Sequence, residues 1–373
     1  MTPRATSQGE ESVLAVNVGS SSLKLALHRF GPAGDARLAH ATVPAGKDDE
    51  PFAACVDALG PIEPPFAIGH RLVHGGPDRF DPTVATPEVA AELRALVSYA
   101  PLHLPAELDA LEAARARFPD AIQVVCFDTG FHRALPAVAK RLPLPRALDE
   151  AGLRRYGFHG LSYEHVVSRL DRTSLARAVI AHLGSGSSLV AIRDGAPVDT
   201  TMGLTPAGGV MMGTRTGDLD PGVILRLLAD GWDRARIERL VEHESGLRGV
   251  SGSTSDMRAL LEARCSDADA ALAVELYVSQ IAKAVGAFAT VLGGLSTLVF
   301  TGGIGERSAP IRAEVCARLA HLGVTIDEAR NQRGEGSIST GDCAVRVVPT
   351  DEELVIARAA WVAARGASRR TTL

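Results

Sequence analysis

Three short segments of this chain combine arginine or histidine with glycine, a mixture that can bind phosphate or carboxylate groups. The residues are Arg71 and His74 in GHRLVHGG, Arg154, Arg155 and His159 in RRYGFHG, and Arg215 and Asp218 in MMGTRTGDLDP. The planar guanidinium of arginine donates paired hydrogen bonds to such anions. Any one of these side chains could instead be an ordinary surface or structural residue. Three such segments on glycine-rich turns favour an anion-binding site, because turns carry ligand contacts more often than helix interiors do.

Three oxygen-bearing side chains are candidate ligands for a divalent cation, namely Asn17, Asp128 and Glu352. Mg²⁺ is usually held by one or two carboxylates together with phosphate oxygens and water. Asp128 directly follows an apolar run that is typical of a buried strand. Glu352 is expected at the start of the last helix, where a carboxylate could equally compensate the helix dipole.

Two similar segments, about half a chain apart, must help to position these groups. VLAVNVGSSSLKLAL covers residues 13–27, and VIAHLGSGSSLVAIRDG covers residues 179–195. Each pattern predicts a strand, a Gly/Ser turn and a second strand. Such a turn can bring several backbone N–H groups and hydroxyls close to one anion. The repetition predicts a duplicated domain, with two phosphate loops facing each other across a cleft.

Strands and helices alternate along the rest of the chain, which is typical of α/β layers. We expect strands over residues 13–18, 23–29, 38–43, 67–73, 122–127, 297–300 and 345–348, besides those of the second repeat. Helices are expected over residues 87–98, 105–118, 222–242, 268–292 and 350–364. A glycine-rich turn, GGIG at residues 302–305, follows one of these strands and precedes a helical pattern. Glycine there would let the backbone approach a ligand closely.

The composition excludes several classes of protein. The chain has 373 residues, enough for two domains, and its 39 Lys and Arg against 44 Asp and Glu give a net charge of −5. Without a basic excess we expect no nucleic-acid partner. We expect no membrane span, because no run approaches ~20 apolar residues. Five scattered cysteines indicate reduced thiols in a cytoplasmic protein. The GxxxxGK[ST] and GxGxxG signatures are missing, so a nucleotide would be bound without a P-loop or a Rossmann-type turn.

Taken together, the motifs resemble the acetokinase family, which belongs to the actin-like, Hsp70-like and sugar-kinase-like ATPases. The matching segments are VLAVNVGSSSLK, GHRLVHGG, APLHLPAEL, CFDTGFH, RRYGFHG, AHLGSG, PVDTTMGLTP, GVMMGTRTGDLDPG, SGLRGVSGSTSDMR, FTGGIGERS and PTDEELVIAR. They occur in family order over residues 13–358. The resemblance implies two duplicated actin-like (ribonuclease H-like) domains with a nucleotide and substrate cleft between them. Residues 1–145 with 355–373 would form the first domain and residues 146–354 the second.

The resemblance also implies a function. Enzymes of this family are cytoplasmic homodimers that transfer a phosphoryl group reversibly and in line from ATP to acetate, giving acetyl phosphate and ADP. They use Mg²⁺, with Mn²⁺ as an alternative. Asn17 and Glu352 would position the cation, with Asp128 acting nearby through water. Arg71 and Arg215 would clamp the carboxylate and the phosphoryl group.

Further roles follow from the same resemblance. His159 would hydrogen-bond the phosphoryl oxygens, and His182 would support the phosphate loop. The residues implied to bind the nucleotide are Lys24, His182, Gly184, Ser185, Gly186, Asp256, Met257, Arg258, Gly302, Gly303, Ile304 and Gly305. The residues implied to form a small apolar pocket for the acyl group are Val73, Leu102, Phe158 and Pro206.

The chain departs from the family pattern at four positions. Ser185 and Asp351 stand where the family usually has Asn, Leu104 replaces the Asn of LHNP, and Tyr163 replaces the second His of GFHGTSH. Ser185 and Tyr163 favour one alternative, a catalytically weak nucleotide-binding protein of the same fold. A second alternative is a propionate or other short-chain acyl kinase with the same machinery. A third, a sugar or polyol kinase, needs an aspartate that deprotonates a hydroxyl, for which Asp128 is the candidate.

The chemistry of the implied reaction explains this choice of residues. A carboxylate acceptor is already ionised at pH 7, since such groups titrate near ~4, and it needs no general base. The difficulty is repulsion between two anions, which arginines and a divalent cation relieve while they hold the reactants in line. We also expect the two lobes to close on ATP and exclude water.

Overall fold

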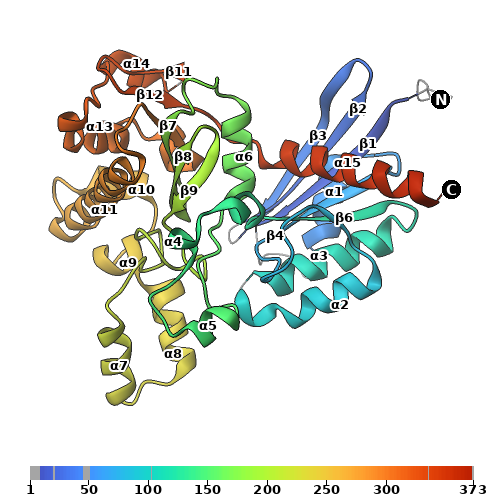
Figure 1. Ribbon diagram of the computed structural model, residues 1–373, viewed down its shortest axis with the longest axis horizontal. Helices are drawn as coiled ribbons and strands as arrows, with labels where there is room; N and C mark the ends of the chain where they lie inside the picture. Colours follow the sequence, from blue (N-terminus) through green and yellow to red (C-terminus); the bar gives the residue numbers. More distant parts are fainter. Residues whose placement is uncertain (1–8, 20–21, 45–50, 102, 335, 372–373) are drawn as a thin grey trace. The chain divides into compact units, whose positions relative to one another are not determined.

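The computed structural model describes residues 9–19, 22–44, 51–101, 103–334 and 336–371, which fall into two compact units (Figure 1). Unit 1 comprises Met1–Phe131 and Asp351–Leu373, and unit 2 comprises His132–Thr350. Each unit is built on one sheet, and the two sheets have the same internal topology.

Unit 1 contains a sheet of six described strands. Their order is β3 (Gly34–Pro44), β2 (Ser22–Gly31), β1 (Glu11–Val18), β4 (Ala67–Leu72), β6 (Ile122–Phe127) and β5 (Thr83–Val84). Strand β1 is antiparallel to β2 and parallel to β4, and β4 is parallel to β6. The carboxyl ends of β1, β4 and β6 therefore lie at the same edge, where Asn17 and Arg71 are the penultimate residues of their strands and Asp128 follows β6.

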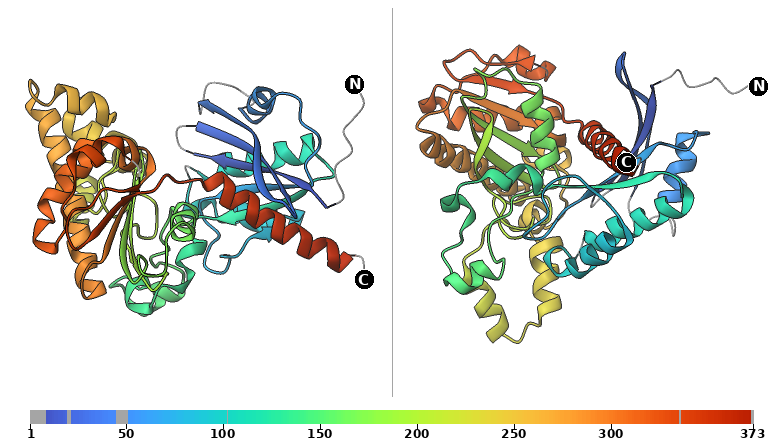
Figure 2. Two further views of the ribbon diagram at one scale, coloured as in Figure 1. Left: turned by 90° about the horizontal axis from the view of Figure 1, so that it is seen from above. Right: turned by 45° about the vertical axis from the view of Figure 1, so that its right-hand side comes forward.

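Helices cover both faces of the unit 1 sheet (Figure 2). Leu14, Val16 and Ile68 form one core cluster with α1 (Pro51–Leu59) and α3 (Leu104–Arg117). The other face packs against α15 (Glu352–Thr371). A Cβ atom at Gly69 would lie 2.8 Å from side-chain atoms of Ala360 and Ile356, so only glycine allows α15 to pack this closely on β4. Helix α2 (Pro87–Ala95) packs on α3, and its side-chain cap is Thr86.

Unit 2 repeats this arrangement. Its described strands are ordered β11 (Gly336–Ser337), β12 (Ala344–Val347), β10 (Thr297–Thr301), β7 (Arg177–Leu183), β8 (Ser187–Arg193) and β9 (Ala196–Thr200). Strand β7 is antiparallel to β8 and parallel to β10, and β10 is parallel to β12. The series β9-β8-β7-β10-β12 thus matches β3-β2-β1-β4-β6, and the predicted duplicated α/β fold is confirmed.

The main core helix of unit 2 is α11 (Ala268–Leu292). Its buried residues include Tyr277, Ile281, Val285 and Phe288, at the i, i+4, i+8, i+11 spacing of one helix face. By length and composition alone α11 could cross a membrane, which the sequence pattern did not lead us to expect. Its contacts with β7, β8 and neighbouring helices explain the apolar composition, since this face fills the core of the unit.

The described part of unit 2 contains ten further α-helices. They are α4 (Ala137–Lys140), α5 (Arg146–Glu150), α6 (Gly160–Ser168), α7 (Pro221–Ala229), α8 (Arg234–Arg239), α9 (Gly246–Ser251), α10 (Met257–Ala263), α12 (Gly302–Arg307), α13 (Ala309–Arg318) and α14 (Glu328–Arg333). Of these, α7 and α8 project away from the core (Figure 1). The single helix expected over residues 222–242 is instead α7, α8 and a π-helical segment, Leu240–Glu244. Gly231, at φ +85°, follows α7 in a backbone conformation that ends a helix.

Candidate active site

The edge of unit 1 where β4 and β6 end carries a buried ion cluster centred on Arg71. Its Nη2 donates to Asp128 Oδ2 at 2.5 Å, and its Nε donates to the same oxygen at 3.1 Å. Its Nη1 donates to the carbonyl of Val18 at 2.9 Å and to Glu107 Oε1 at 3.2 Å. All three nitrogens of the guanidinium are engaged, so the direction of the side chain is fixed. Burial alone would lower the pKa of Arg71, but the carboxylates of Asp128, Glu107 and Glu352 raise it above its ordinary value.

Glu107, on α3, is a member of this cluster that the sequence analysis missed. Its carboxyl is 1% exposed, and its Oε2 accepts a hydrogen bond from the Val73 N–H at 2.8 Å. Burial raises the pKa of Glu107 to about 7, against the lowering effect of Arg71. Glu107 lies in the matched segment APLHLPAEL, but an acidic residue in the first turn of a helix is usually explained by the helix dipole.

Asn17 joins the start of α15 to the same region of unit 1. Its Nδ2 donates to Glu352 Oε2 and to Glu353 Oε1, both at 2.9 Å. Lys24 faces Asn17 across β1 and β2, and its Nζ lies 3.9 Å from Glu353 Oε1. Burial and the nearby carboxylate of Asp128 raise the pKa of Glu352, while Arg71 lowers it. Glu353 is a second residue that the sequence analysis did not select.

This cluster fits a hard divalent cation. The Oδ1 atom of Asp128 is buried without a hydrogen-bond partner. The negative charge of Asp128 also raises the pKa of Glu352, because two carboxylates lie close together. A divalent cation would offset both costs. Within the described ranges, no three Asp, Glu, His or Cys side chains form a ready-made metal site. Mg²⁺ in phosphoryl transfer usually binds one or two carboxylates and completes its shell with phosphates and water.

In unit 2, two stacked histidines lie beside the second Gly/Ser turn. His159, at φ 57° and ψ 26°, occupies the left-handed region and precedes α6. Its ring stacks on His182, with centroids 4.2 Å apart and planes at 21°. His182 Nδ1 is 2.8 Å from Ser162 Oγ, and His159 Nδ1 is 2.8 Å from Ser188 Oγ. Hydrogen bonds at both rings therefore fix how the pair is oriented.

Gly186 marks the point where His159 and Arg215 come together. A Cβ atom at Gly186 would lie 3.3 Å both from His159 Nε2 and from Arg215 Nη1. Arg215 is 9% exposed; its Nη1 donates to the Pro206 carbonyl at 3.3 Å, and its Nε lies 3.4 Å from Glu242 Oε2. Burial raises the pKa of Glu242, while Arg215 lowers it. A guanidinium and an imidazole thus flank backbone that has no side chain, an arrangement suited to phosphoryl oxygens.

The Gly/Ser turn after β7 and the start of α12 lie close to each other in unit 2, and the turn expected over residues 302–305 is instead the beginning of that helix. A Cβ atom at Gly184 would be 3.8 Å from the Gly303 nitrogen, and one at Gly302 would be 2.7 Å from the Leu183 carbonyl. Gly302 also has φ +76°, so a larger residue there would be strained and would clash. The carbonyl of Ser185 accepts a hydrogen bond from the Gly213 N–H at 3.0 Å. This bond ties the turn to the loop that carries Arg215.

Other residues predicted for the nucleotide have structural roles here. Asp256 caps α10, accepting from the N–H groups of Arg258 and Ala259. Met257 is 5% exposed in the core of unit 2, and the exposed Arg258 pairs with Glu262. Ile304 and Gly305 belong to the short helix α12. Contact of these residues with a nucleotide stays a prediction.

The acyl pocket also stays a prediction. Val73 belongs to unit 1, while Phe158 and Pro206 belong to unit 2. Val73 and Phe158 are each 1% exposed. Leu102 lies outside the described residues, as do Ser20 and Ser21 of the first Gly/Ser turn.

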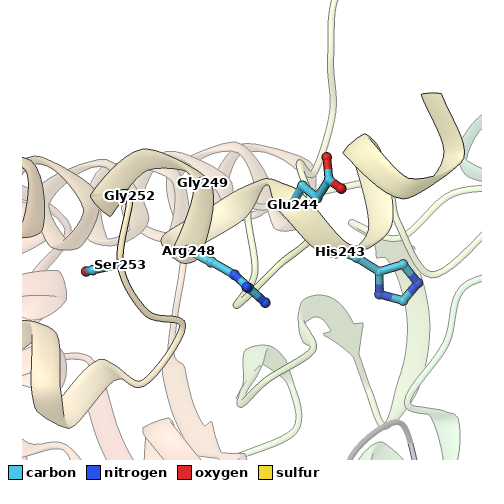
Figure 3. A pocket seen from close by; sticks show the side chains of 6 residues that line it. All are labelled: His243, Glu244, Arg248, Gly249, Gly252 and Ser253. Carbon is cyan, nitrogen blue, oxygen red and sulfur yellow. The ribbon is translucent and has the colours of Figure 1, made fainter. Parts of the chain in front are cut away.

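A cavity of about 460 Å³ borders the Arg215 loop in unit 2. It is lined by His243, Glu244, Arg248, Gly249, Gly252 and Ser253. Figure 3 shows the side chains of His243 and Arg248 extending to one side and that of Glu244 to the other. The backbone N–H of Arg248 donates to the Gly213 carbonyl at 3.0 Å. The cavity therefore adjoins the loop before Arg215, but none of the residues predicted for chemistry lines it.

Comparisons with known proteins identify the family of the chain. Residues 63–358 match the model of the acetokinase family. An acetate kinase of Rhodopseudomonas palustris (strain TIE-1) is 44% identical, over 95% of this chain and 98% of the relative. The crystal structure of a propionate kinase from Francisella tularensis superposes with a TM-score of 0.83 at 32% identity, covering 94% of this chain and 99% of that one. That of Porphyromonas gingivalis acetate kinase gives a TM-score of 0.77 at 35% identity, covering 95% and 99%. The chain belongs to the acetokinase family.

Proposed function

We propose that this chain transfers the γ-phosphoryl group of ATP to acetate, reversibly and in line. A carboxylate oxygen of acetate forms a bond to the γ-phosphorus. The bond from that phosphorus to the β,γ-bridging oxygen breaks, and its electron pair leaves with ADP. The observation that carries the proposal is the fixed guanidinium of Arg71 beside the unpartnered oxygen of Asp128, in a chain of this family.

Different residues of the chain would stabilise the charges of the two reactants. No general base is needed, because acetate is already an anion at neutral pH. Arg71, held between Asp128 and Glu107, would present a fixed positive charge to the carboxylate. Arg215 and His159, on either side of Gly186, would donate to the oxygens of the phosphoryl group in transfer.

A divalent cation completes the proposal. Asn17, Asp128 and Glu352 would hold Mg²⁺, or Mn²⁺, directly or through water. When bound, the cation would neutralise phosphate charge and relieve the crowding of carboxylates in unit 1. The main task of the protein in this region is to keep Glu352 and Glu353 fixed by the amide of Asn17.

Propionate is the second candidate acceptor, because a solved relative with a TM-score of 0.83 is a propionate kinase. One methylene in an apolar pocket changes the discrimination by only ~1–3 kcal/mol. We therefore expect acetate to be preferred and propionate to be used more slowly. An equal or higher kcat/KM with propionate than with acetate would make the chain a propionate kinase.

Hydroxylamine trapping of the acyl phosphate tests the proposal. Purified protein would be incubated with MgATP and a panel of carboxylates, with glucose and glycerol as hydroxyl controls. We expect acetohydroxamate and ADP in equal amounts. ADP without hydroxamate in the presence of a polyol would indicate a sugar or polyol kinase. Absence of both products in protein that binds ATP would indicate a nucleotide-binding protein without this activity.

We further propose that the protein works as a cytoplasmic homodimer. Exposed apolar side chains on α7 support a second copy as the partner: Val223, Leu225 and Leu228 are 41%, 67% and 49% exposed. The five cysteines, none of which forms a disulfide bond, and the use of ATP suit the cytoplasm. Sedimentation should give a dimer, and Leu225→Glu combined with Leu228→Glu should give a monomer. A wild-type monomer would contradict this part of the proposal.

A further inference from the structure

The hydroxyl of Ser188 lies between the side chains of His159, which precedes α6, and Tyr163, in the first turn of α6. Its Oγ is 2.8 Å from His159 Nδ1, and it also shares a short hydrogen bond with the hydroxyl of Tyr163. Ser188 and Tyr163 are both 0% exposed. Tyr163 follows His159 by one helical turn, and its N–H donates to the His159 carbonyl at 3.0 Å. The first turn of α6 therefore presents both side chains to one serine of β8.

The backbone conformation of His159 also restricts the position of its side chain. It is one of only two non-glycine residues with positive φ in the part of the chain that the structure describes. Such a conformation costs on the order of 1 kcal/mol or more and persists only where the surroundings enforce it. The ring stack on His182 and the bond to Ser188 supply that enforcement. As a result Nε2, rather than Nδ1, faces Gly186 and Arg215.

The protons of this hydrogen-bonded chain can be arranged in more than one way, because the Ser188 hydroxyl donates one hydrogen bond and can accept two. If Tyr163 donates to Ser188 and Ser188 donates to Nδ1, a neutral His159 carries its proton on Nε2. If Nδ1 instead donates to Ser188, Nε2 would be a bare acceptor, and it would repel an anionic phosphoryl oxygen. We propose that Ser188 and Tyr163 are positioning residues that hold His159 as the Nε2–H tautomer. This inference rests on the proposed function for its purpose, but the tautomer itself is a property of the free protein.

Tyr163 stands where the acetokinase pattern usually has a second histidine. A histidine there could donate or accept, whereas a phenol at neutral pH carries its proton and can donate it. The Tyr163 hydroxyl can therefore act as the donor toward Ser188.

Nitrogen-15 NMR of histidine in the ligand-free protein tests the proposal directly. The His159 signals would be assigned with His159→Gln and compared between wild type, Tyr163→Phe and Ser188→Ala. We expect wild-type His159 to be protonated on Nε2, and the two variants to show a mixture with the Nδ1–H form. Tyr163→His should restore much of the wild-type spectrum. Tyr156→Phe is the matched control, because that buried hydroxyl donates to the Gly152 carbonyl at 2.9 Å instead.

Kinetics give the second readout. Loss of one such hydrogen bond should lower kcat about 10-fold in Tyr163→Phe, while KM for ATP and for acetate changes less than about threefold. A wild-type Nδ1–H tautomer would overturn the proposal. So would a Tyr163→Phe variant that is folded and keeps the wild-type tautomer. Either result can occur in a protein that makes acetyl phosphate, so failure of this inference is distinguishable from failure of the proposed function.

Discussion

The candidate clusters of the two units lie at corresponding strand ends of two sheets with the same topology, but they consist of different kinds of residue. In unit 1, the strand ends β1, β4 and β6 carry Asn17, Arg71 and Asp128, which are joined to Glu107 and Glu352 by charge and hydrogen bonds. In unit 2, β7 leads into the Gly/Ser turn and β10 leads into α12, which begins with two glycines, and His159 and Arg215 lie beside Gly186. A duplicated scaffold can therefore place fixed charge at one edge and bare backbone at the other.

The difference has a physical basis. Buried charges need partners, and unit 1 meets that need internally through the guanidinium of Arg71 and the amide of Asn17. A phosphate needs close approach, and unit 2 provides it by omitting side chains at Gly184, Gly186 and Gly302. Substitutions in unit 1 should therefore affect both stability and catalysis, whereas those near Arg215 should affect mainly catalysis.

The largest effect is expected from Arg71→Ala. The change leaves Asp128 and Glu107 buried without their guanidinium, which costs about 3 kcal/mol or more of unfolding free energy. Turnover should also fall by ~100-fold or more. Urea unfolding and the hydroxamate assay measure the two effects. Arg226→Ala, which removes an exposed pair with Asp230, is the control and should change neither by much. A fully stable and active Arg71→Ala variant would contradict our account of unit 1.

Glu352→Gln should weaken the use of Mg²⁺. It keeps the size of the side chain but removes a charge beside Asp128, so the Mg²⁺ concentration for half-maximal activity should rise on the order of 10-fold. Chelation of the cation should abolish activity in both proteins. The neighbouring Glu353→Gln, whose carboxylate also accepts from Asn17, should have a smaller effect. Equal effects from the two substitutions would argue against Glu352 as the metal-positioning residue.

Glu107→Gln should change how stability depends on pH. The pKa of Glu107 is raised from 4.5 to about 7, so the folded state binds more protons than the unfolded state between these values. The stabilising contribution of the Glu107 proton to the free energy of unfolding is fully present below pH 4.5 and is lost as the pH rises toward 7. Across that window the stability of wild type relative to Glu107→Gln should fall by on the order of 3 kcal/mol. Denaturant unfolding at several pH values measures this, and parallel stability curves would refute it.

The smallest effect concerns Asp256. As the cap of α10 it should contribute about 1 kcal/mol, which Asp256→Ala would lose and Asp256→Ser would largely keep. If Asp256 also contacts the nucleotide, KM for ATP should rise in both variants. An unchanged KM in the serine variant would leave Asp256 with a capping role alone.

The fold and the motif positions could be predicted because strand periodicity and glycine turns are local signals. The repeated strand-turn-strand segments predicted the duplication. The apolar run before Asp128 predicted that this carboxylate lies at the end of a buried strand, β6. Glu107 and Glu353 could not be separated from ordinary acids in the first turn of a helix. The Tyr163–Ser188 hydrogen bond joins residues 25 positions apart and has no sequence signature. The roles of Asn17, Arg71, Arg215 and His159 toward ligands stay predictions.

Single-turnover kinetics of Arg215→Ala test the central claim, that a guanidinium and an imidazole beside Gly186 stabilise the phosphoryl group as it moves. Enzyme in excess over ATP, with saturating Mg²⁺ and acetate, would be quenched and assayed for acetyl phosphate. We expect the transfer step to slow by ~100-fold or more, with a native circular dichroism spectrum and an ATP affinity that changes far less. A folded variant whose transfer rate is near that of wild type would contradict the account.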